Sequence, residues 1–423
     1  MPIISLKVIF RNVSLLLQKL PYCHELSNGE TEPITVLEAV VKQTGVYSQS
    51  RKGRLSVYWG DQVFIPSAPF RYTPTHHIDI MCTLLGEEAP TEEEWKEQGL
   101  DKYGVIAVSK GSDKNAAQVE KVDHATATRM LKSLGDIGSV GPSLGSFSIS
   151  AAMVDALCKE FSSELEKKEG KLDTDPHFWM PLTLAEADYI SLMSQKDVDE
   201  AESKAHHERM AKMKASFDLG GMGMFGAVDV GKDACWWDYG QLKYYYSYNM
   251  KIIDSDENSR LLRKFLGITE NVMNSKIDAS VSLDETSRVF SSKIISSGSI
   301  TKSVLASVTA NEITAEDAII VNCVAKKIKA GKGAILYNLI NDSEEGIVAG
   351  DGEVIVSVTD KDGKMMILKS NTSTDGGKAW KTKLEQNEMS FQDVHGKNKD
   401  SNVGEIEKKR KELYKSVAES LEQ

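Results

Sequence analysis

The sequence lacks the long apolar run that a transmembrane helix needs. No stretch of its 423 residues approaches 18 consecutive apolar residues, so a membrane-spanning helix is not expected. The first twenty residues are interrupted by Lys7, Arg11 and Lys19 and make a poor secretory signal. The absence of an acidic residue before Glu25 leaves import into an organelle open. We expect a cytoplasmic protein that does not bind membranes.

Positive charge and cysteine are also scarce. The chain has 51 Lys and Arg against 62 Asp and Glu, a formal net charge of −11. Nucleic acid is therefore not expected as a partner, although a small phosphorylated ligand could bind a local basic pocket. The five cysteines contain no CxxC pair, which argues against a disulfide framework and favours a reducing compartment.

The patterns that are present predict an α/β domain followed by a solenoid. Strand-like and helix-like segments alternate between residues 33 and 267, beginning with a capped helix over 35–44. Residues 151–161 predict a helix with one apolar face. The polar region 185–230 predicts a helical insertion on the surface.

From about residue 274 to 348, short β-branched runs recur with a period of about 15. Two sets of residues occupy matching positions: Ile300, Ile313 and Ile328, and Val304, Ile319 and Ile335. This period is typical of a β-solenoid, with a β-sandwich as the alternative. We expect an α/β domain over 1–267, a β-helix over 268–350 that could self-associate, and an extension over 351–423 that ends in a helix.

Two aspartates follow aromatic, strand-like segments. Asp61 follows residues 55–59, which alternate as in a strand, and Asp238 lies between Trp237 and a predicted helix start near Gln241. Ligands bind beyond the carboxyl ends of strands in open α/β sheets, and a carboxylate beside a buried strand needs a cation or donors. An ordinary turn at Asp61 and a helix cap at Asp238 are the alternatives.

A predicted hairpin over 103–121 ends in Glu120 and Lys121, for which an exposed ion pair is the alternative.

These segments occur in the order seen in the sugar-1-phosphate nucleotidyltransferases, the family of UDP-glucose pyrophosphorylase-like proteins. "YWGDQVF" and "WWDYGQLKYYYSYN" resemble the two segments that supply that family's magnesium carboxylates. "AQVEKVDHATA" is similar to its Val-Glu-Lys segment, and "SLGSFSIS" to a strand whose first glycine lets the backbone approach the sugar. A β-helix after the catalytic domain is common in the family.

The resemblance implies a Rossmann-like mixed-sheet domain and a Mg²⁺-dependent reaction. An NTP, with UTP as first choice, and a sugar-1-phosphate such as glucose-1-phosphate would give an NDP-sugar and pyrophosphate. The implied residues are Asp61 and Asp238 as catalytic metal ligands, Lys121 as a catalytic ligand of the sugar phosphate, and Glu120, Gly104 and Gly145 as further substrate-binding residues.

One part of the family pattern is missing. The family opens with a Gly-rich loop that holds the triphosphate, whereas only Gly29, Gly45 and Gly53 precede Asp61 here. The resemblance therefore implies a chain that begins inside the fold, and we expect little or no turnover from it. The alternative is a non-catalytic regulatory paralogue that binds a nucleotide sugar or a catalytic partner.

Four further patterns carry little chemistry. The Gly-rich stretch 220–226 lacks the strand and helix that flank a phosphate loop, and we interpret it as a flexible connection. Residues 141–145 match G-x-S-x-G, but the predicted strand follows the serine instead of preceding it. His76-His77 and His206-His207 lack metal-ligand spacing, which favours surface or core histidines. Asp173 and Asp175 fit an ordinary turn.

Overall fold

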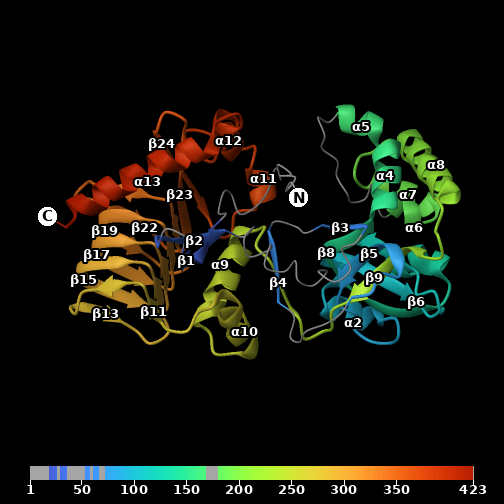
Figure 1. Ribbon diagram of the computed structural model, residues 1–423, viewed down its shortest axis with the longest axis horizontal. Helices are drawn as coiled ribbons and strands as arrows, with labels where there is room; N and C mark the ends of the chain where they lie inside the picture. The colour runs from blue at the N-terminus through green and yellow to red at the C-terminus, as the bar shows by residue number, and fades with distance from the viewer. Residues whose placement is uncertain are drawn as a thin grey trace. The chain divides into compact units, whose positions relative to one another are not determined.

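The computed structural model describes residues 19–25, 29–35, 53–57, 61–65, 72–167 and 180–422. They form two compact units, each described here by itself (Figure 1). The solenoid unit contains the described residues of 1–42, 60–65 and 235–423, and the sheet unit those of 43–59 and 66–234. The helix expected over 35–44, Gly45, Asp173 and Asp175 lie outside the described residues. No described helix has the length and apolar composition needed to cross a membrane.

The sheet unit is built on a six-stranded mixed sheet, in the order β7-β6-β8-β5-β9 with β3 paired to β8. Strands β5 and β9 run parallel, and the other pairs are antiparallel. The elements are β3 (Arg54–Val57), β5 (His76–Cys82), α2 (Glu92–Glu97), η3 (Leu100–Lys102), β6 (Gly104–Ser109), β7 (Ala116–Glu120), α3 (His124–Met130), η4 (Leu131–Leu134), β8 (Ile137–Ser150), α4 (Ala151–Glu160), α5 (Ser162–Lys167), α6 (Met180–Thr183), α7 (Glu186–Ser194), α8 (Glu200–Ser216) and β9 (Gly223–Asp229). The expected α/β class is thus confirmed at the level of helices packed on a mixed sheet.

Helices cover both faces of this sheet. Alternate residues of β6 enter different cores, Ile106 on one face and Val105 on the other. The predicted amphipathic helix α4 is confirmed, and it packs with Met210 of α8 on the Ile106 side. Tyr189 of α7 is buried on the opposite side. The helices of region 185–230 therefore contribute to the core of the unit and are not only a surface insertion.

The Gly-rich stretch 220–226, interpreted from the sequence as a flexible connection, is in part a strand. Its second half begins strand β9, because Gly223 and Gly226 leave room for the ring of His76. A Cβ at these two positions would lie 2.0 and 2.2 Å from atoms of that ring. Three of the four paired histidines are buried: His76, His77 and His206, whose Nδ1 lies 2.7 Å from the Tyr189 hydroxyl. His207 is partly buried.

A buried ion pair ties three strands of the sheet unit together. Arg54 Nη2 of β3 lies 3.2 Å from Asp79 Oδ2 of β5, and the two side chains are 6% and 0% exposed. Arg54 Nε also donates to Ser148 Oγ of β8 at 2.7 Å. The Tyr72 hydroxyl donates to Asp79 as well. Both charges are therefore paired and hydrogen bonded, which offsets the cost of removing them from water.

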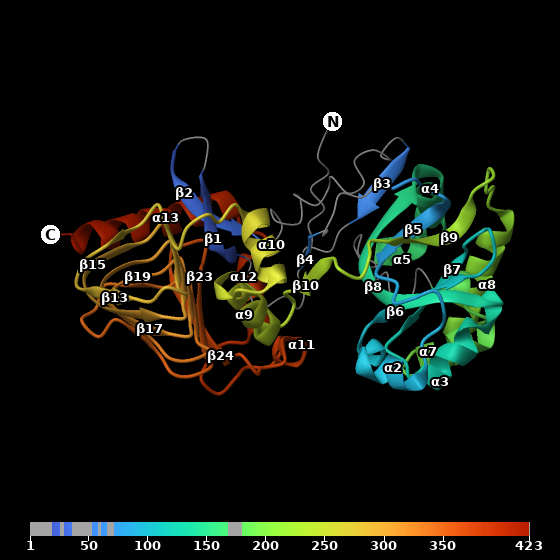
Figure 2. The same cartoon turned by 90° about the horizontal axis from the view of Figure 1, so that it is seen from below.

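The solenoid unit contains a β-solenoid of about five turns, which confirms the expected β-helix. Its two main sheets have the orders β11-β14-β16-β18-β20-β23-β24 and β12-β15-β17-β19-β21 (Figures 1 and 2). The elements of the unit are β1 (Lys19–Glu25), β2 (Thr31–Thr35), β4 (Gln62–Ile65), β10 (Cys235–Asp238), α9 (Leu242–Met250), η5 (Lys251–Ile253), α10 (Glu257–Leu266), β11 (Val272–Met273), β12 (Lys276–Ile277), β13 (Val281–Leu283), β14 (Arg288–Phe290), β15 (Lys293–Thr301), β16 (Val304–Ala306), β17 (Thr309–Glu316), β18 (Ile319–Val321), β19 (Val324–Ala330), β20 (Ile335–Tyr337), β21 (Ile340–Asn341), β22 (Ile347–Ala349), β23 (Glu353–Thr359), β24 (Met365–Asn371), α11 (Gly376–Ala379), α12 (Phe391–Asn398) and α13 (Val403–Ser420).

The register of the coils matches one of the two predicted sets of residues. Val304 pairs with Ile319, and Ile319 with Ile335, as expected. Ile313 pairs with Ile328 but stacks on Gly298, so placing Ile300 in this set was wrong. Ile300 lies two positions further along β15, and side chains two residues apart point to the same face of a strand. The pattern of buried residues therefore could not reveal the error.

Serine side chains satisfy backbone groups where the coils turn. Ser275 Oγ accepts a hydrogen bond from Ser292 N at 2.9 Å, and Ser292 Oγ accepts one from Val308 N at 3.0 Å in the next coil. Ser287 and Ser303 are linked in the same way at 3.0 Å. These serines thus supply acceptors for backbone amides of the neighbouring coil, as groups buried between coils require.

The C-terminal helix α13 packs on the solenoid, which confirms the helix predicted near the end of the chain and identifies it as a packing element (Figure 1). Val417 and Leu421 form an apolar cluster with Val324 of β19. The Tyr414 hydroxyl donates to the carbonyl oxygen of Ser307 at 2.9 Å.

The boundary between the two units differs from the one expected at residue 267. Residues 235–266 pack with the solenoid, and α9 contacts β18. The Tyr246 hydroxyl of α9 donates to the carbonyl oxygen of Asp317 at 2.8 Å. Since β10 pairs with β4 in the same unit, residues 61–65 also belong with the solenoid.

We expect Arg54→Met to lower the free energy of unfolding of the sheet unit by about 3–5 kcal/mol, because Asp79 stays buried without its cation. Arg54→Met/Asp79→Asn should recover much of this loss. Urea unfolding monitored by circular dichroism measures both. Arg260→Met is the control, because its ion pair with Glu257 is exposed and should contribute less than about 1 kcal/mol. Equal losses for the two single variants would contradict the prediction.

Candidate functional site

Asp61 and Asp238 come together at one end of a two-stranded ribbon in the solenoid unit. Strand β4 runs antiparallel to β10, with Gln62 opposite Asp238. The amide of Tyr239 donates to the carbonyl oxygen of Asp61 at 2.7 Å and extends the pairing by one residue. An antiparallel ribbon places the start of one strand beside the end of the other. This pairing makes neighbours of two aspartates that are 177 positions apart in the chain.

The two carboxylates share the space beside Gly240. A Cβ at this position would lie 2.9 Å from Asp238 Oδ1 and 3.0 Å from Asp61 Oδ2, which puts the two oxygens within about 6 Å of each other. The amide of Gly240 donates to Asp238 Oδ1 at 2.7 Å. Glycine thus keeps the space between the carboxylates open and supplies a donor to one of them.

The surroundings of Asp61 disfavour its ionised form. Burial, and then the nearby charge of Asp238, raise the pKa of Asp61 from its ordinary value of 3.8 to about 6. At pH 7 the Asp61 carboxyl is therefore mostly ionised, at a cost in free energy. A divalent cation between them would remove that cost.

The two carboxylates suit a Mg²⁺ site that is completed by water and substrate better than a site made only of protein ligands. The described residues contain no group of three or more His, Cys, Asp and Glu side chains placed to hold a metal ion. Mg²⁺ usually keeps several waters and takes one or two carboxylates together with substrate phosphates. Asp61 and Asp238 supply two carboxylates, whereas a structural zinc site needs four protein ligands.

The position of Asp61 differs from the expected one, and the alternative role considered for Asp238 is excluded. Asp61 directly precedes β4, so it does not lie at the carboxyl end of a strand in the main sheet. Strand β3, the described part of the predicted strand before it, pairs with β8 in the sheet unit, and residues 58–60 lie outside the described residues. The N-cap of α9 is Gln241, so Asp238 does not cap that helix.

Glu120 and Lys121 lie at the exit of the β6–β7 hairpin in the sheet unit, as predicted. Gly104 pairs with Glu120 across the hairpin, and a Cβ at Gly104 would lie 2.6 Å from Glu120 Oε2. Glycine is therefore needed for the carboxylate to lie over β6. Lys121 has a φ of 53°, in the left-handed region. Its Nζ lies 3.1 Å from Glu120 Oε1, and its side chain is 67% exposed.

Two polar residues beside Gly104, Gln118 and Ser143, were not predicted from the sequence; a Cβ at Gly104 would lie 2.9 Å from Gln118 Nε2 and 3.5 Å from the Ser143 Cβ. Gln118 is 2% exposed, and its Nε2 lies 3.4 Å from Glu120 Oε2. Its Oε1 has no hydrogen-bond partner among the described residues. Ser143 Oγ accepts a hydrogen bond from the amide of Gly145, whose φ is 75°. The spacing of two residues between Gln118 and Glu120 on one strand is the signal that could have indicated Gln118.

The predicted site residues thus form two groups, one in each unit. The carboxylate pair of Asp61 and Asp238 belongs to the solenoid unit. The second group, in the sheet unit, consists of Gly104, Glu120, Lys121 and Gly145. Pairing between strands brings residues together within each group.

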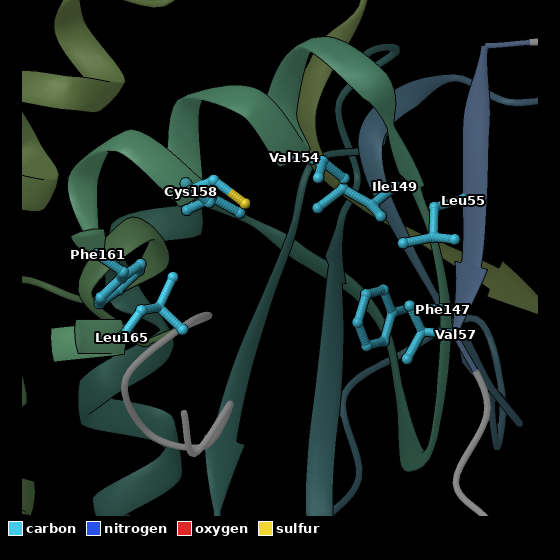
Figure 3. Close-up of a pocket in the computed structure, with 9 residues that line it drawn as sticks. Leu55, Val57, Phe147, Ile149, Val154, Cys158, Phe161 and Leu165 are labelled. Atoms are coloured by element: carbon cyan, nitrogen blue, oxygen red, sulfur yellow. The ribbon is translucent and has the colours of Figure 1, made fainter. Parts of the chain in front are cut away.

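An apolar cavity of about 200 Å³ lies elsewhere in the sheet unit (Figure 3). Its lining comes from β3, β8, α4 and α5, and includes Leu55, Phe147, Cys158 and Phe161. None of the predicted site residues contributes to it.

The chain matches none of the protein-family models with which it was compared, and it matches no curated protein sequence.

We expect Asp61→Asn to stabilise the protein at pH 7.5 in the absence of divalent metal but not at pH 4. A carboxyl whose pKa rises on folding does not destabilise the folded state at a pH below its unfolded pKa. Its destabilisation grows between about pH 4 and pH 6, and it is constant at higher pH. The shift of Asp61 from 3.8 to about 6 corresponds to as much as about 3 kcal/mol. Calorimetric melting temperatures from pH 4 to 8, in buffer with a chelator, measure this effect.

The control is Asp342→Asn, which changes an exposed aspartate of the same unit. It should leave the pH dependence of the melting temperature unchanged. A pH-independent effect of Asp61→Asn would contradict the electrostatic interpretation.

Proposed function

We propose that this chain is a sugar-1-phosphate nucleotidyltransferase-type protein, with UTP and glucose-1-phosphate as the first choice of substrates. The observation that carries the proposal is the convergence of Asp61 and Asp238, two distant carboxylates held together at a cost in free energy. The resemblance of their sequence segments to the magnesium-binding segments of that family supports the same conclusion. The Rossmann-like topology and self-association through the solenoid are part of this proposal.

The carboxylate pair is proposed to hold Mg²⁺ together with the phosphates of the nucleotide. Bound Mg²⁺ supplies positive charge that offsets the phosphate oxygens during transfer. The role of Asp61 and Asp238 is to fix the position of that charge. The amide of Gly240 helps by holding Asp238 Oδ1 in one orientation.

The second group is proposed to bind the sugar phosphate. Glu120 presents a carboxylate that can accept hydrogen bonds from sugar hydroxyls, with Gln118 beside it. Lys121 has an exposed ammonium group, and its ion pair with Glu120 costs little to break. The lysine is therefore able to turn towards an anionic phosphate.

The reaction would proceed by direct displacement. An oxygen of the sugar phosphate forms a bond to the α-phosphorus of the nucleotide while the bond to the departing pyrophosphate breaks. No covalent bond to the protein forms, so the side chains serve to position the reactants and to offset charge.

We expect Lys121→Gln to weaken the binding of glucose-1-phosphate about tenfold or more and to leave the melting temperature unchanged. The lost interaction is a charge-assisted contact with the phosphate, whereas the exposed side chain contributes little to stability. Isothermal titration measures the affinity. Lys132→Gln, at an exposed lysine of the same unit, should behave like the unchanged protein. Unchanged affinity in Lys121→Gln would remove the lysine from the proposed site.

Release of pyrophosphate from UTP and glucose-1-phosphate in the presence of Mg²⁺ tests the function itself. An active transferase would release pyrophosphate, and Asp238→Asn would abolish this release. Binding of UDP-glucose without turnover would favour the non-catalytic paralogue. Absence of both binding and turnover would overturn the proposal.

A further inference from the structure

We propose that the solenoid positions the Asp61–Asp238 pair through helix α9, with Tyr246 as the positioning residue. This inference rests on the proposed function, since it concerns the carboxylates that are proposed to hold the metal ion. It assigns the solenoid a role in the geometry of that site, in addition to any role in self-association.

Helix α9 connects the carboxylate pair directly to the solenoid. The helix begins at Leu242, four residues after Asp238, and it contacts β18. It lies alongside the solenoid in both views (Figures 1 and 2). The Tyr246 hydroxyl donates a hydrogen bond of 2.8 Å to the carbonyl oxygen of Asp317.

The carbonyl group that Tyr246 contacts belongs to a well-anchored part of the solenoid. Asp317 occupies a corner between β17 and β18 with a φ of 50°. Its amide donates to the carbonyl oxygen of Thr301 in the preceding coil at 2.9 Å. All three residues of β18, which follows this corner, are fully buried. The acceptor therefore has a position set by the stacked coils and can serve as a fixed point for the helix.

Aromatic rings of α9 pack against the two residues on either side of Asp238, so the position of the helix affects both of them. Tyr248 lies edge-on to Tyr239, with ring centres 5.9 Å apart, and 6.3 Å from Trp237. Tyr245 makes a second edge-on contact with Tyr239 at 6.3 Å. Trp237 and Tyr239 are 4% and 1% exposed. A shift of α9 would therefore move both chain neighbours of Asp238.

Metal binding depends strongly on such shifts. Mg²⁺ accepts oxygens at about 2.1 Å in nearly ideal octahedral geometry, and sites that lose their supporting contacts become too loose to bind well. The Gly240 amide orients Asp238 Oδ1 locally. The contact of Tyr246 with the solenoid holds the helix that follows, and hence the backbone from which that oxygen projects.

The test is a titration of the full chain with Mn²⁺ at pH 7.5, in which electron paramagnetic resonance measures free Mn²⁺. Asp238→Asn identifies the binding that belongs to the carboxylate pair. Tyr246→Phe should weaken that binding by about two- to thirtyfold, the range of coupling transmitted through packed side chains. The substitution keeps the ring and removes only the hydroxyl group.

Tyr414→Phe is the matched control. Its hydroxyl also donates to a carbonyl oxygen of the solenoid, that of Ser307 at 2.9 Å, but it lies on α13. Both variants lose a hydrogen bond between a helix and the solenoid, so both should lower the melting temperature to a similar degree. Only Tyr246→Phe should weaken the binding of Mn²⁺.

Each outcome separates this inference from the proposed function. If Asp238→Asn loses Mn²⁺ binding while Tyr246→Phe retains full affinity, the metal site stands and the positioning role of Tyr246 is wrong. Equal weakening in Tyr246→Phe and Tyr414→Phe would show a general loss of stability and would also overturn the inference. If Asp238→Asn binds Mn²⁺ as tightly as the unchanged chain, the metal site of the proposed function is itself wrong.

Discussion

Backbone hydrogen bonds between β4 and β10 bring two distant parts of the chain into one ribbon, and the carboxylate pair exists only because of this pairing. The entropic cost of closing a loop grows slowly with its length, so a separation of 177 positions is no obstacle once the ribbon packs on a stable support. The solenoid provides that support through α9. A slip of β4 by one residue would reverse its side chains and place Asp61 on the other face.

The arrangement of Asp61 beside Asp238 costs stability, as is expected of the proposed metal site. Burial and mutual repulsion raise the pKa of Asp61, so the ionised pair lowers the free energy of unfolding at neutral pH. Functional sites are where such strained arrangements are retained. By contrast, Arg54 and Asp79 are buried as an oppositely charged pair with further hydrogen bonds, and their position inside the sheet indicates a structural role.

Glycine acts in the same way in both candidate groups of residues. At Gly104 and Gly240, the missing Cβ leaves space that a carboxylate group occupies or borders. At Gly223 and Gly226, the ring of His76 fills the corresponding space, and no candidate site residue is involved. A glycine in the sequence therefore indicates a close approach, but only its neighbours in the fold distinguish a site from a packing contact.

The sequence alone determined those features that depend on local periodicity. A repeat of about 15 residues predicts stacked coils because each coil must place apolar residues inside, and the apolar face of α4 follows from the spacing of its own residues. Pairing between distant strands could not be read in this way. The neighbours of Asp61, the assignment of residues 235–266 to the solenoid, the strand that begins at Gly223 and the burial of Gln118 beside Glu120 all depend on contacts whose partners lie far apart in the chain. The spacing of residues carries no record of these contacts, so only the tertiary structure decided them.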